Sequence, residues 1–377
     1  MPFGSEAIEP GIGLALSGGG FRAVLFHVGS VMRLNQSGLL KKISRISSVS
    51  GGSIASGVLA VHWDQLQFDP SGIATNLEAQ FVAPLRNFCG KTIDTWSIIS
   101  GALNPFKTAG DEVIEHYRDD LGLGIKLSAL SDTGPRFVFN ATNLATGSSF
   151  RFSKPYCGDY RIGLIEAPKH DFDVALAVGC SSAFPPVLSP IEIDLDPSLF
   201  TRTEGADLFD RIDFRKRLPL ADGGVYDNLG LETVWGRYDT VLVSDAGKPF
   251  EFDSALSTAV PKQILRVMDI GLNQALALRK RMLIHQYEKA AAKGAFWGIA
   301  TQISHYKAAD SLPVSPNKIS ELSGIRTRLD KFSTQEQCEL INWGYAVTDA
   351  AMRAGTSGMQ ILPVAPTWPH PEFPLDE

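Results

Sequence analysis

The sequence predicts an α/β fold in which helices cover a parallel sheet. Two stretches carry this prediction, residues 12–34 and residues 43–61. Each passes from a short apolar run through glycines into a run whose apolar residues have helical spacing. Successive strand and helix units of this kind are typical of parallel sheets. Because such sheets bind ligands at the carboxyl ends of their strands, we expect the functional site near these glycines.

The composition is that of a globular protein with ample material for a core. The 377 residues are 44% hydrophobic and 20% charged. The formal net charge of -6 argues against a nucleic-acid partner, because phosphate binding relies on clustered lysine and arginine.

Cysteine usage and the first residues indicate a reducing, cytoplasmic location. The four cysteines are widely separated without C-x-x-C spacing, so neither a zinc site nor a disulfide framework is predicted. Residues 1–10 lack the apolar region of a secretory signal. No stretch approaches the roughly 18 apolar residues of a spanning helix, so membrane contact is expected to be peripheral.

Ser50 is the predicted nucleophile. It ends an apolar run and precedes a helix, and Gly51 and Gly52 follow it directly. This order matches the nucleophile elbow, where a sharp turn between strand and helix presents the serine hydroxyl. Small residues are needed because the chain reverses within a few atoms. The motif usually has glycine two places before the serine, and here Ser48 holds that place.

The first glycine run, Gly18, Gly19 and Gly20, is the predicted oxyanion hole. Backbone N–H groups at a helix start are suited to stabilising a developing oxyanion. Arg22 lies one residue further into the helix, where its guanidinium either holds the loop or attracts an anionic head group. An exposed helix arginine is the equally weighted alternative.

Asp222 is the predicted base. It ends an apolar run and is followed by two glycines, so a tight turn would present its carboxylate at the edge of the sheet. Asp245 is the fallback and Asp227 a weaker candidate. No histidine lies in a turn that would present it to the site, and His27 is expected to be a core or helix-surface residue.

Three elements in this order resemble the patatin-like phospholipase family: the loop Gly18 to Arg22, the elbow Ser48 to Gly52, and the turn Asp222-Gly223-Gly224. The run 181–185 resembles a further segment of that family, and the similarity covers residues 12–246. It implies a three-layer α/β/α fold with a mainly parallel sheet. It also implies a Ser-Asp dyad, here Ser50 and Asp222, that needs no histidine, metal or cofactor.

The resemblance implies hydrolysis of acyl esters in phospholipids or related lipids, of the phospholipase A or lysophospholipase type. The enzyme would then be cytoplasmic and peripheral to the membrane that supplies its substrate. Some bacterial members of this kind are membrane-degrading effectors activated by a nucleotide, so a small-molecule activator is a further candidate partner. Neither the head group, the acyl position nor the oligomeric state is predicted.

The catalytic domain is expected over residues 10–250, with 64–130 as a cap or lid. Residues 251–377 are expected to form C-terminal helices packed on the body, and the proline-rich stretch 363–377 to lack regular structure.

Two C-terminal helices are predicted in particular. The stretch 262–293 has amphipathic spacing and a basic cluster at 279–281. A helix packed on the body with a solvated charged face is favoured there over a membrane-surface role. Ser333 and Glu336 form a capping box that starts a helix running toward Arg353 and stopping at Gly355.

Three other functions are alternatives. The glycine loop satisfies a dinucleotide-binding pattern, but the acidic residue needed about twenty positions on is absent between Glu9 and Asp64. An α/β-hydrolase with a Ser-Asp-His triad would use His285 or His305. A catalytically inactive lipid-binding protein is the third, and Ser48 is the only feature that suggests it.

Overall fold

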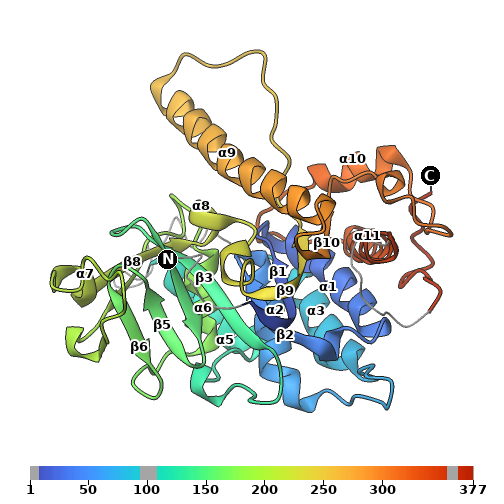
Figure 1. Ribbon diagram of the computed structural model, residues 1–377. Helices are drawn as coiled ribbons and strands as arrows, with labels where there is room; N and C mark the ends of the chain where they lie inside the picture. The colour runs from blue at the N-terminus through green and yellow to red at the C-terminus, as the bar shows by residue number, and fades with distance from the viewer. Residues whose placement is uncertain (1–7, 94–107, 355–363, 377) are drawn as a thin grey trace.

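The computed structural model describes residues 8–93, 108–354 and 364–376 (Figure 1). The predicted helix stop at Gly355 and residues 94–107 of the predicted lid lie outside these ranges. The strands are β1 Glu9–Leu16, β2 Ile43–Ser48, β3 Arg136–Asn143, β4 Ser148–Ser153, β5 Tyr156–Asp159, β6 Gly163–Glu166, β7 Ile191–Asp194, β8 Arg217–Asp222, β9 Tyr238–Asp245 and β10 Lys293–Gly298. The helices are α1 Gly20–Gln36, α2 Gly51–His62, α3 Ala83–Cys89, α5 Ala109–Leu121, α6 Val174–Ser182, α7 Asp213–Lys216, α8 Gly224–Asp227, α9 Val260–Glu288, α10 Pro316–Gly324 and α11 Thr334–Arg353.

One sheet organises the described chain. Its order is β10-β9-β1-β2-β3-β4-β5-β6, and all pairs from β10 to β3 are parallel. Beyond β3 the pairs are antiparallel, and β8 pairs with β3 while β7 pairs with β8. The central sheet is thus parallel, as predicted, and an antiparallel wing extends it.

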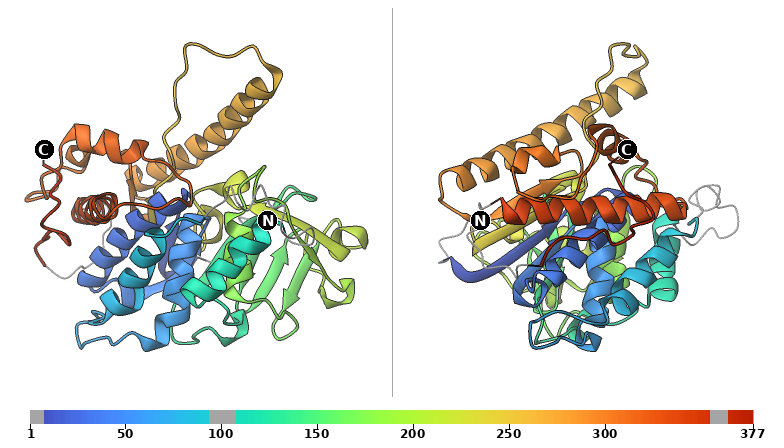
Figure 2. Two further views of the ribbon diagram at one scale, coloured as in Figure 1. Left: turned by 180° about the vertical axis from the view of Figure 1, so that it is seen from behind. Right: turned by 90° about the vertical axis from the view of Figure 1, so that its right-hand side faces the viewer.

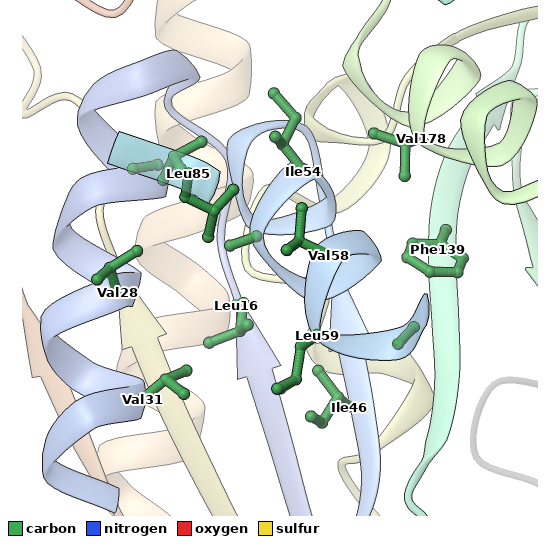
Figure 3. Close-up of a cluster of buried hydrophobic side chains, with 14 of the residues drawn as sticks. Leu16, Val28, Val31, Ile46, Ile54, Val58, Leu59, Leu85, Phe139 and Val178 are labelled. Carbon is green, nitrogen blue, oxygen red and sulfur yellow. The ribbon is translucent and has the colours of Figure 1, made fainter. Parts of the chain in front are cut away.

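Helices cover both faces of the parallel part. Alternate side chains of β1 point to opposite sides, so Leu14 and Leu16 join the larger core while Ala15 joins the smaller one. Figure 3 shows the larger core, where Val28 of α1 and Val58 of α2 lie over the sheet. The smaller core includes Leu283 of α9. The three-layer α/β/α prediction is confirmed.

The last long helix, α11, is part of the same body because its backbone approaches that of α1 closely. A Cβ atom on Gly29 would lie 1.9 Å from the carbonyl oxygen of Ile341. One on Gly344 would lie 1.9 Å from the carbonyl oxygen of Phe26. Only glycine therefore fits at either position. The predicted capping box of Ser333 and Glu336 is present at the start of α11.

Buried polar contacts hold the C-terminal tail against α11. Asp349 of α11 pairs with Arg33 of α1 at 2.7 Å, and both side chains are buried. The same guanidinium donates to the carbonyl of Val364. Nδ2 of Asn342 donates to the carbonyls of His370 and Phe373, each at 2.8 Å. The described part of the tail thus has no helix or strand, as predicted, yet is packed.

The stretch predicted as one helix over 262–293 is instead a helix and a strand. α9 ends at Glu288, and β10 begins at Lys293 as an edge strand parallel to β9. A Cβ atom on Gly294 would lie 1.8 Å from the carbonyl oxygen of Val241, so the close approach of the two strands requires glycine. A strand of six residues with two glycines gave no recognisable strand pattern.

Only the C-terminal part of α9 packs on the body. Leu283 is buried, and the Tyr287 hydroxyl donates to the carbonyl of Val241 at 2.7 Å. The N-terminal half projects away from the sheet in every view (Figures 1 and 2). The prediction of a helix packed along its length with a solvated charged face is therefore wrong for this half. Within the described ranges, no helix combines the length and apolar character that a bilayer span requires.

Candidate active site

The strand ends carrying Ser50 and Asp222 meet because β2 and β8 reach the same edge of β3 from opposite directions. β2 runs parallel to β3 and ends with Ser48 opposite Phe139. β8 runs antiparallel and ends with Asp222 opposite Ala141. Only one residue of β3 separates these two positions. The Ser50 hydroxyl consequently lies beside Asp222, where it favours the ionised form of the carboxylate.

The residue between them, Asn140, is part of this junction. Its Nδ2 donates to the carbonyl of Ser48 at 2.9 Å, and its own carbonyl accepts from the Ser181 hydroxyl at 2.6 Å. A Cβ atom on Gly223 would lie 2.2 Å from that carbonyl oxygen. Glycine after Asp222 is therefore needed to let the turn pass β3.

Ser50 has the backbone of a nucleophile elbow. Its φ of 52° and ψ of -122° lie in a region that residues with a side chain rarely adopt. Its amide donates to both the carbonyl and the hydroxyl of Ser181, each at 3.1 Å. A Cβ atom on Gly52 would lie 2.4 Å from the carbonyl oxygen of Leu16. Tertiary contacts thus hold the strained residue in place.

Ser48 fills the position where the motif usually has glycine. Its φ is not positive, so a side chain is tolerated there. The buried Ser48 hydroxyl accepts from the hydroxyls of Ser53 at 3.0 Å and Ser56 at 2.7 Å. These bonds join the end of β2 to the first turns of α2, and the departure from the motif leaves the elbow intact.

Asp222 is held in one orientation and is nearly sealed from water. Its side chain is 2% exposed, and its Oδ1 accepts from the amide of Gly224 at 2.7 Å. Its own amide donates to the carbonyl of Ala183 at 2.8 Å. Burial raises the pKa of Asp222 to about 6, although the bonds from Gly224 and Ser50 favour the ionised form.

The glycine loop lies beside the dyad at the start of α1. The position of a Cβ atom on Gly18 would be 3.0 Å from the Ser50 Cβ. The Gly18 amide donates to the carbonyl of Asn228 at 3.0 Å, so it is engaged within the protein. The amides of Gly19 and Gly20 lie at the helix start, where N–H groups lack intrahelical acceptors. Of the three glycines predicted to form the oxyanion hole, Gly19 and Gly20 are therefore the ones whose amides remain candidates.

Gly20 occupies a position that only glycine can take. Its φ is 57°, and a Cβ atom would lie 1.5 Å from the carbonyl oxygen of Thr327. The segment around Thr327, which belongs to the C-terminal third of the chain, thus packs directly on the glycine loop.

Arg22 was predicted as an oxyanion-loop or head-group residue, or as an exposed one, and only the loop-holding role agrees with the structure. The side chain is fully buried and does not line the cavity. It donates to the carbonyls of Ser323 at 2.7 Å, Ile325 at 2.8 Å and Ala246 at 2.9 Å. Burial lowers its pKa to about 10, while the charge of Asp245 opposes that shift. Arg22 therefore ties three segments together.

A cavity of about 650 Å³ opens over the dyad. Its base includes Gly18 to Gly20, Ser50 and Asp222. Apolar side chains form much of its wall: Ile54, Phe184, Val187, Leu188, Leu272, Leu276 and Leu329. Part of this wall comes from α9, which sequence reasoning did not connect with the site.

Residues 64–130 were predicted to be the lid, but none of their described members lines the cavity. They pack instead in the larger core, where Phe81, Leu85, Phe88 and Tyr117 are almost fully buried. The cover over the cavity is built from α9 and from residues 247–251 and 327–330.

Asn228 is a site residue that the sequence did not reveal. Asn228 lines the cavity. Three glycines leave room for its side chain, because a Cβ atom on Gly18, Gly224 or Gly247 would lie within 3.0 Å of that side chain. Nothing in the local pattern distinguished this asparagine from others, because two of these neighbours, Gly18 and Gly247, are distant in the sequence.

No histidine of the described chain lines the cavity. His27 is buried between the carbonyl of Ser17 and the hydroxyl of Ser244, each at 2.9 Å, and burial lowers its pKa to about 4. It is a neutral core residue. Neither His285 nor His305 reaches the site, so the geometry gives no support to a Ser-Asp-His triad.

The two fallback acids have other partners. Asp245 forms an ion pair with Lys280 of α9 and accepts from the amide of Gly247 at 3.0 Å. Asp227 lies 3.5 Å from Arg279, also of α9. Neither acid lines the cavity. These pairs also correct the prediction of a solvated basic cluster, since two of its three members contact buried carboxylates.

One group of potential metal ligands occurs among the described residues, formed by Cys338, His370 and Glu372. It lies outside the cavity lining, and the guanidinium of Arg86 donates to the Cys338 sulfur at 3.4 Å. A neighbouring positive charge opposes cation binding, so we assign no metal to this group.

A comparison with models of protein families shows to which family the chain belongs. The model of the family described as patatin-like phospholipase matches residues 14–235, which is more than half of the chain. The chain belongs to the patatin-like phospholipase family. The resemblance predicted from the loop, the elbow and the Asp-Gly-Gly turn is thereby confirmed. All three elements lie within the matched region.

A comparison with solved structures finds similar proteins at low identity. Human GIVD cytosolic phospholipase A2 in complex with methyl gamma-linolenyl fluorophosphonate has a TM-score of 0.50 and 16% identity, over 92% of this chain and 59% of that one. Another structure of human GIVD cytosolic phospholipase A2 has a TM-score of 0.49 and 13% identity, over 95% of this chain and 63% of that one. VipD from Legionella pneumophila has a TM-score of 0.38 and 15% identity, over 93% of this chain and 68% of that one.

The chain spans about three fifths of the length of the human phospholipase chains. A comparison with curated proteins gave no match.

Proposed function

We propose that this patatin-like chain is a serine acyl hydrolase that releases fatty acids from phospholipids. Its family supports lipid acyl hydrolysis. One observation carries the assignment of residues: the Ser50 hydroxyl, on a strained turn, lines the same cavity as the buried Asp222 carboxylate and lies beside it.

In the proposed first half-reaction, Asp222 accepts the hydroxyl proton of Ser50 while the oxygen attacks the ester carbonyl carbon. The amides of Gly19 and Gly20 stabilise the resulting oxyanion. The tetrahedral intermediate collapses, the bond to the lipid alcohol breaks, and Asp222 returns the proton to that leaving oxygen. Ser50 is left acylated.

In the second half-reaction, Asp222 removes a proton from a water molecule, which attacks the acyl carbon. The bond to Ser50 breaks, the serine oxygen regains the proton, and the fatty acid leaves. Because the carboxylate acts directly on the hydroxyl, no histidine is required between them. The apolar wall of the cavity suits an acyl chain, and the enzyme would work peripherally at a cytoplasmic membrane surface.

A fluorophosphonate probe tests this assignment. We expect one covalent adduct by intact-mass analysis, mapped to the peptide containing Ser50, and fatty acid release from phospholipid vesicles. The Ser53→Ala variant is the matched control, since Ser53 is a buried neighbour outside the cavity lining. Labelling elsewhere, or none in folded protein, would contradict the proposal. A preparation that labels but hydrolyses only after a small molecule is added would reveal the regulated effector role.

The pKa of Asp222 predicts the pH profile. The carboxylate must be ionised to accept the proton, and its pKa is raised to about 6. We therefore expect kcat/KM for a soluble ester to rise with a midpoint near pH 6 and to level off above about pH 7. A midpoint near pH 4, the ordinary value for aspartate, would show that the pKa of the base is not raised by burial as the structure predicts for Asp222.

A further inference from the structure

Residues 247–282 are here called the arm, because the middle of this segment projects from the body while its two ends lie over the cavity. The arm comprises the loop that follows β9 and most of α9 (Figures 1 and 2). In the described chain, ten of the eighteen exposed large apolar side chains belong to the arm. Phe252 at its tip is 93% exposed. Apolar side chains gathered on one exposed segment indicate an interaction surface.

The helical part of the arm has two distinct faces. Leu272 and Leu276 line the cavity. A second set of apolar residues is 47% to 69% exposed and recurs at separations of three, four and eleven positions, so that its members share one face. This outer stripe consists of Val260, Ile264, Val267, Leu278 and Met282. The helix thus contributes to the proposed acyl site with one face and leaves an apolar stripe in solvent with the other.

The arm is continuous with the mouth of the cavity. Phe184 and Val187 line the cavity and are about half exposed, so they form an apolar rim outside the arm. An acyl chain that leaves a bilayer for Ser50 has to pass this mouth. The rim therefore marks the entrance through which the substrate reaches the site.

The charge of the arm differs in sign from that of the whole chain. Residues 247–282 contain six basic and three acidic residues, a net charge of +3, whereas the chain carries -6. Arg279 and Lys280 pair with Asp227 and Asp245 of the body, so the arm keeps a net charge of +1 beyond these two pairs. Basic residues near a membrane surface are attracted to anionic lipids. A protein with an otherwise acidic surface would be oriented by this segment as it approaches such a membrane.

We propose that the arm is the membrane-docking element, which lies in the interface of a bilayer containing anionic phospholipids. Its outer stripe enters the boundary between head groups and acyl chains, as amphipathic interfacial helices do. Docking then places the cavity mouth against the lipid surface. The proposal rests on the proposed function, because it takes the cavity as the acyl site.

The test measures binding separately from catalysis. The full chain carrying Ser50→Ala, which leaves vesicles intact, is titrated with vesicles of phosphatidylcholine and phosphatidylglycerol in equal amounts, and with phosphatidylcholine alone. The arm variant combines Ile264→Glu with Val267→Glu, and the matched control is Ile212→Glu. Ile264 and Ile212 are 63% and 58% exposed, but Ile212 lies on the body beside α7.

We expect the arm variant to bind the mixed vesicles at least about tenfold more weakly, and the control to bind like its parent. Mixed vesicles should bind better than neutral ones, and added salt should reduce that difference. With Ser50 restored, the arm variant should hydrolyse a soluble short-chain ester at the parental rate.

Parental vesicle affinity of the folded arm variant would overturn the proposal. The proposal would also be overturned if light scattering showed that the arm variant changes only its oligomeric state. The outer stripe would then bind a second copy of the chain. Equal binding to neutral and mixed vesicles would overturn the anionic preference. Arm-dependent vesicle binding by a protein that hydrolyses no ester would support the docking element and refute the proposed function.

Discussion

Replacing Ser50 with alanine is expected to lower the rate of ester hydrolysis by about 10⁴-fold or more, since covalent catalysis has no substitute nucleophile at this position. Near the elbow, the hydroxyls of Ser53 and Ser56 bond to that of Ser48, and the hydroxyl of Ser181 bonds to the Ser50 amide. None of these four serines lines the cavity, and the hydroxyl of Ser182, which does line it, donates to the carbonyl of Val178. Fatty acid release from phospholipid vesicles and fluorophosphonate labelling should be lost together.

The strained backbone of Ser50 provides a control for this loss. Alanine keeps the cost of a φ of 52°, whereas glycine removes it. Ser50→Gly should therefore be inactive but more stable than Ser50→Ala by about 1 kcal/mol in urea unfolding. Activity of either variant above about one hundredth of the parental rate would mean that another group attacks the ester.

The local parts of the site were predictable from the sequence because local chemistry determines them. A glycine at which a Cβ atom would lie 2.4 Å from a carbonyl oxygen, such as Gly52, leaves a signature in the sequence at that point. So does a serine between a buried strand and a helix. The nucleophile, the glycine loop and the Asp-Gly-Gly turn each occupy a few consecutive residues, and the structure brings all three to one cavity.

Pairing and burial over long sequence separations were not predictable in this way. Nothing in residues 217–222 shows that β8 runs antiparallel to β3 and meets the end of β2. Arg22 was thought to reach an anion or solvent, whereas its acceptors include carbonyls more than 300 residues away. The mixed pattern of residues 64–130 favours a lid there, whereas the cover over the cavity comes from α9. Only the tertiary contacts distinguish the two faces of α9.

Replacing Asp222 with asparagine is expected to lower ester hydrolysis by about 10² to 10⁴-fold, because asparagine cannot accept the Ser50 proton. The amide side chain has the same shape and retains an oxygen for the bond from Gly224. The variant should therefore fold, and its loss of activity should appear in kcat rather than KM. The residual rate should no longer change around pH 6. Parental activity, or a pH profile that is unchanged in the variant, would exclude Asp222 as the base.

The same substitution should stabilise the protein at neutral pH. The folded-state pKa of about 6 lies above the ordinary value of 3.8, so the folded protein holds this proton more tightly than the unfolded chain. The resulting contribution to stability is fully present below pH 3.8 and is lost as the pH rises through about 6. At pH 8 the ionised, buried carboxylate then costs about 3 kcal/mol, which asparagine avoids. Urea unfolding should show Asp222→Asn more stable than the parent at pH 8 and equal to it near pH 3.5. Equal stability at both values would mean that Asp222 has no raised pKa, and the proposed direct base would lose its physical basis.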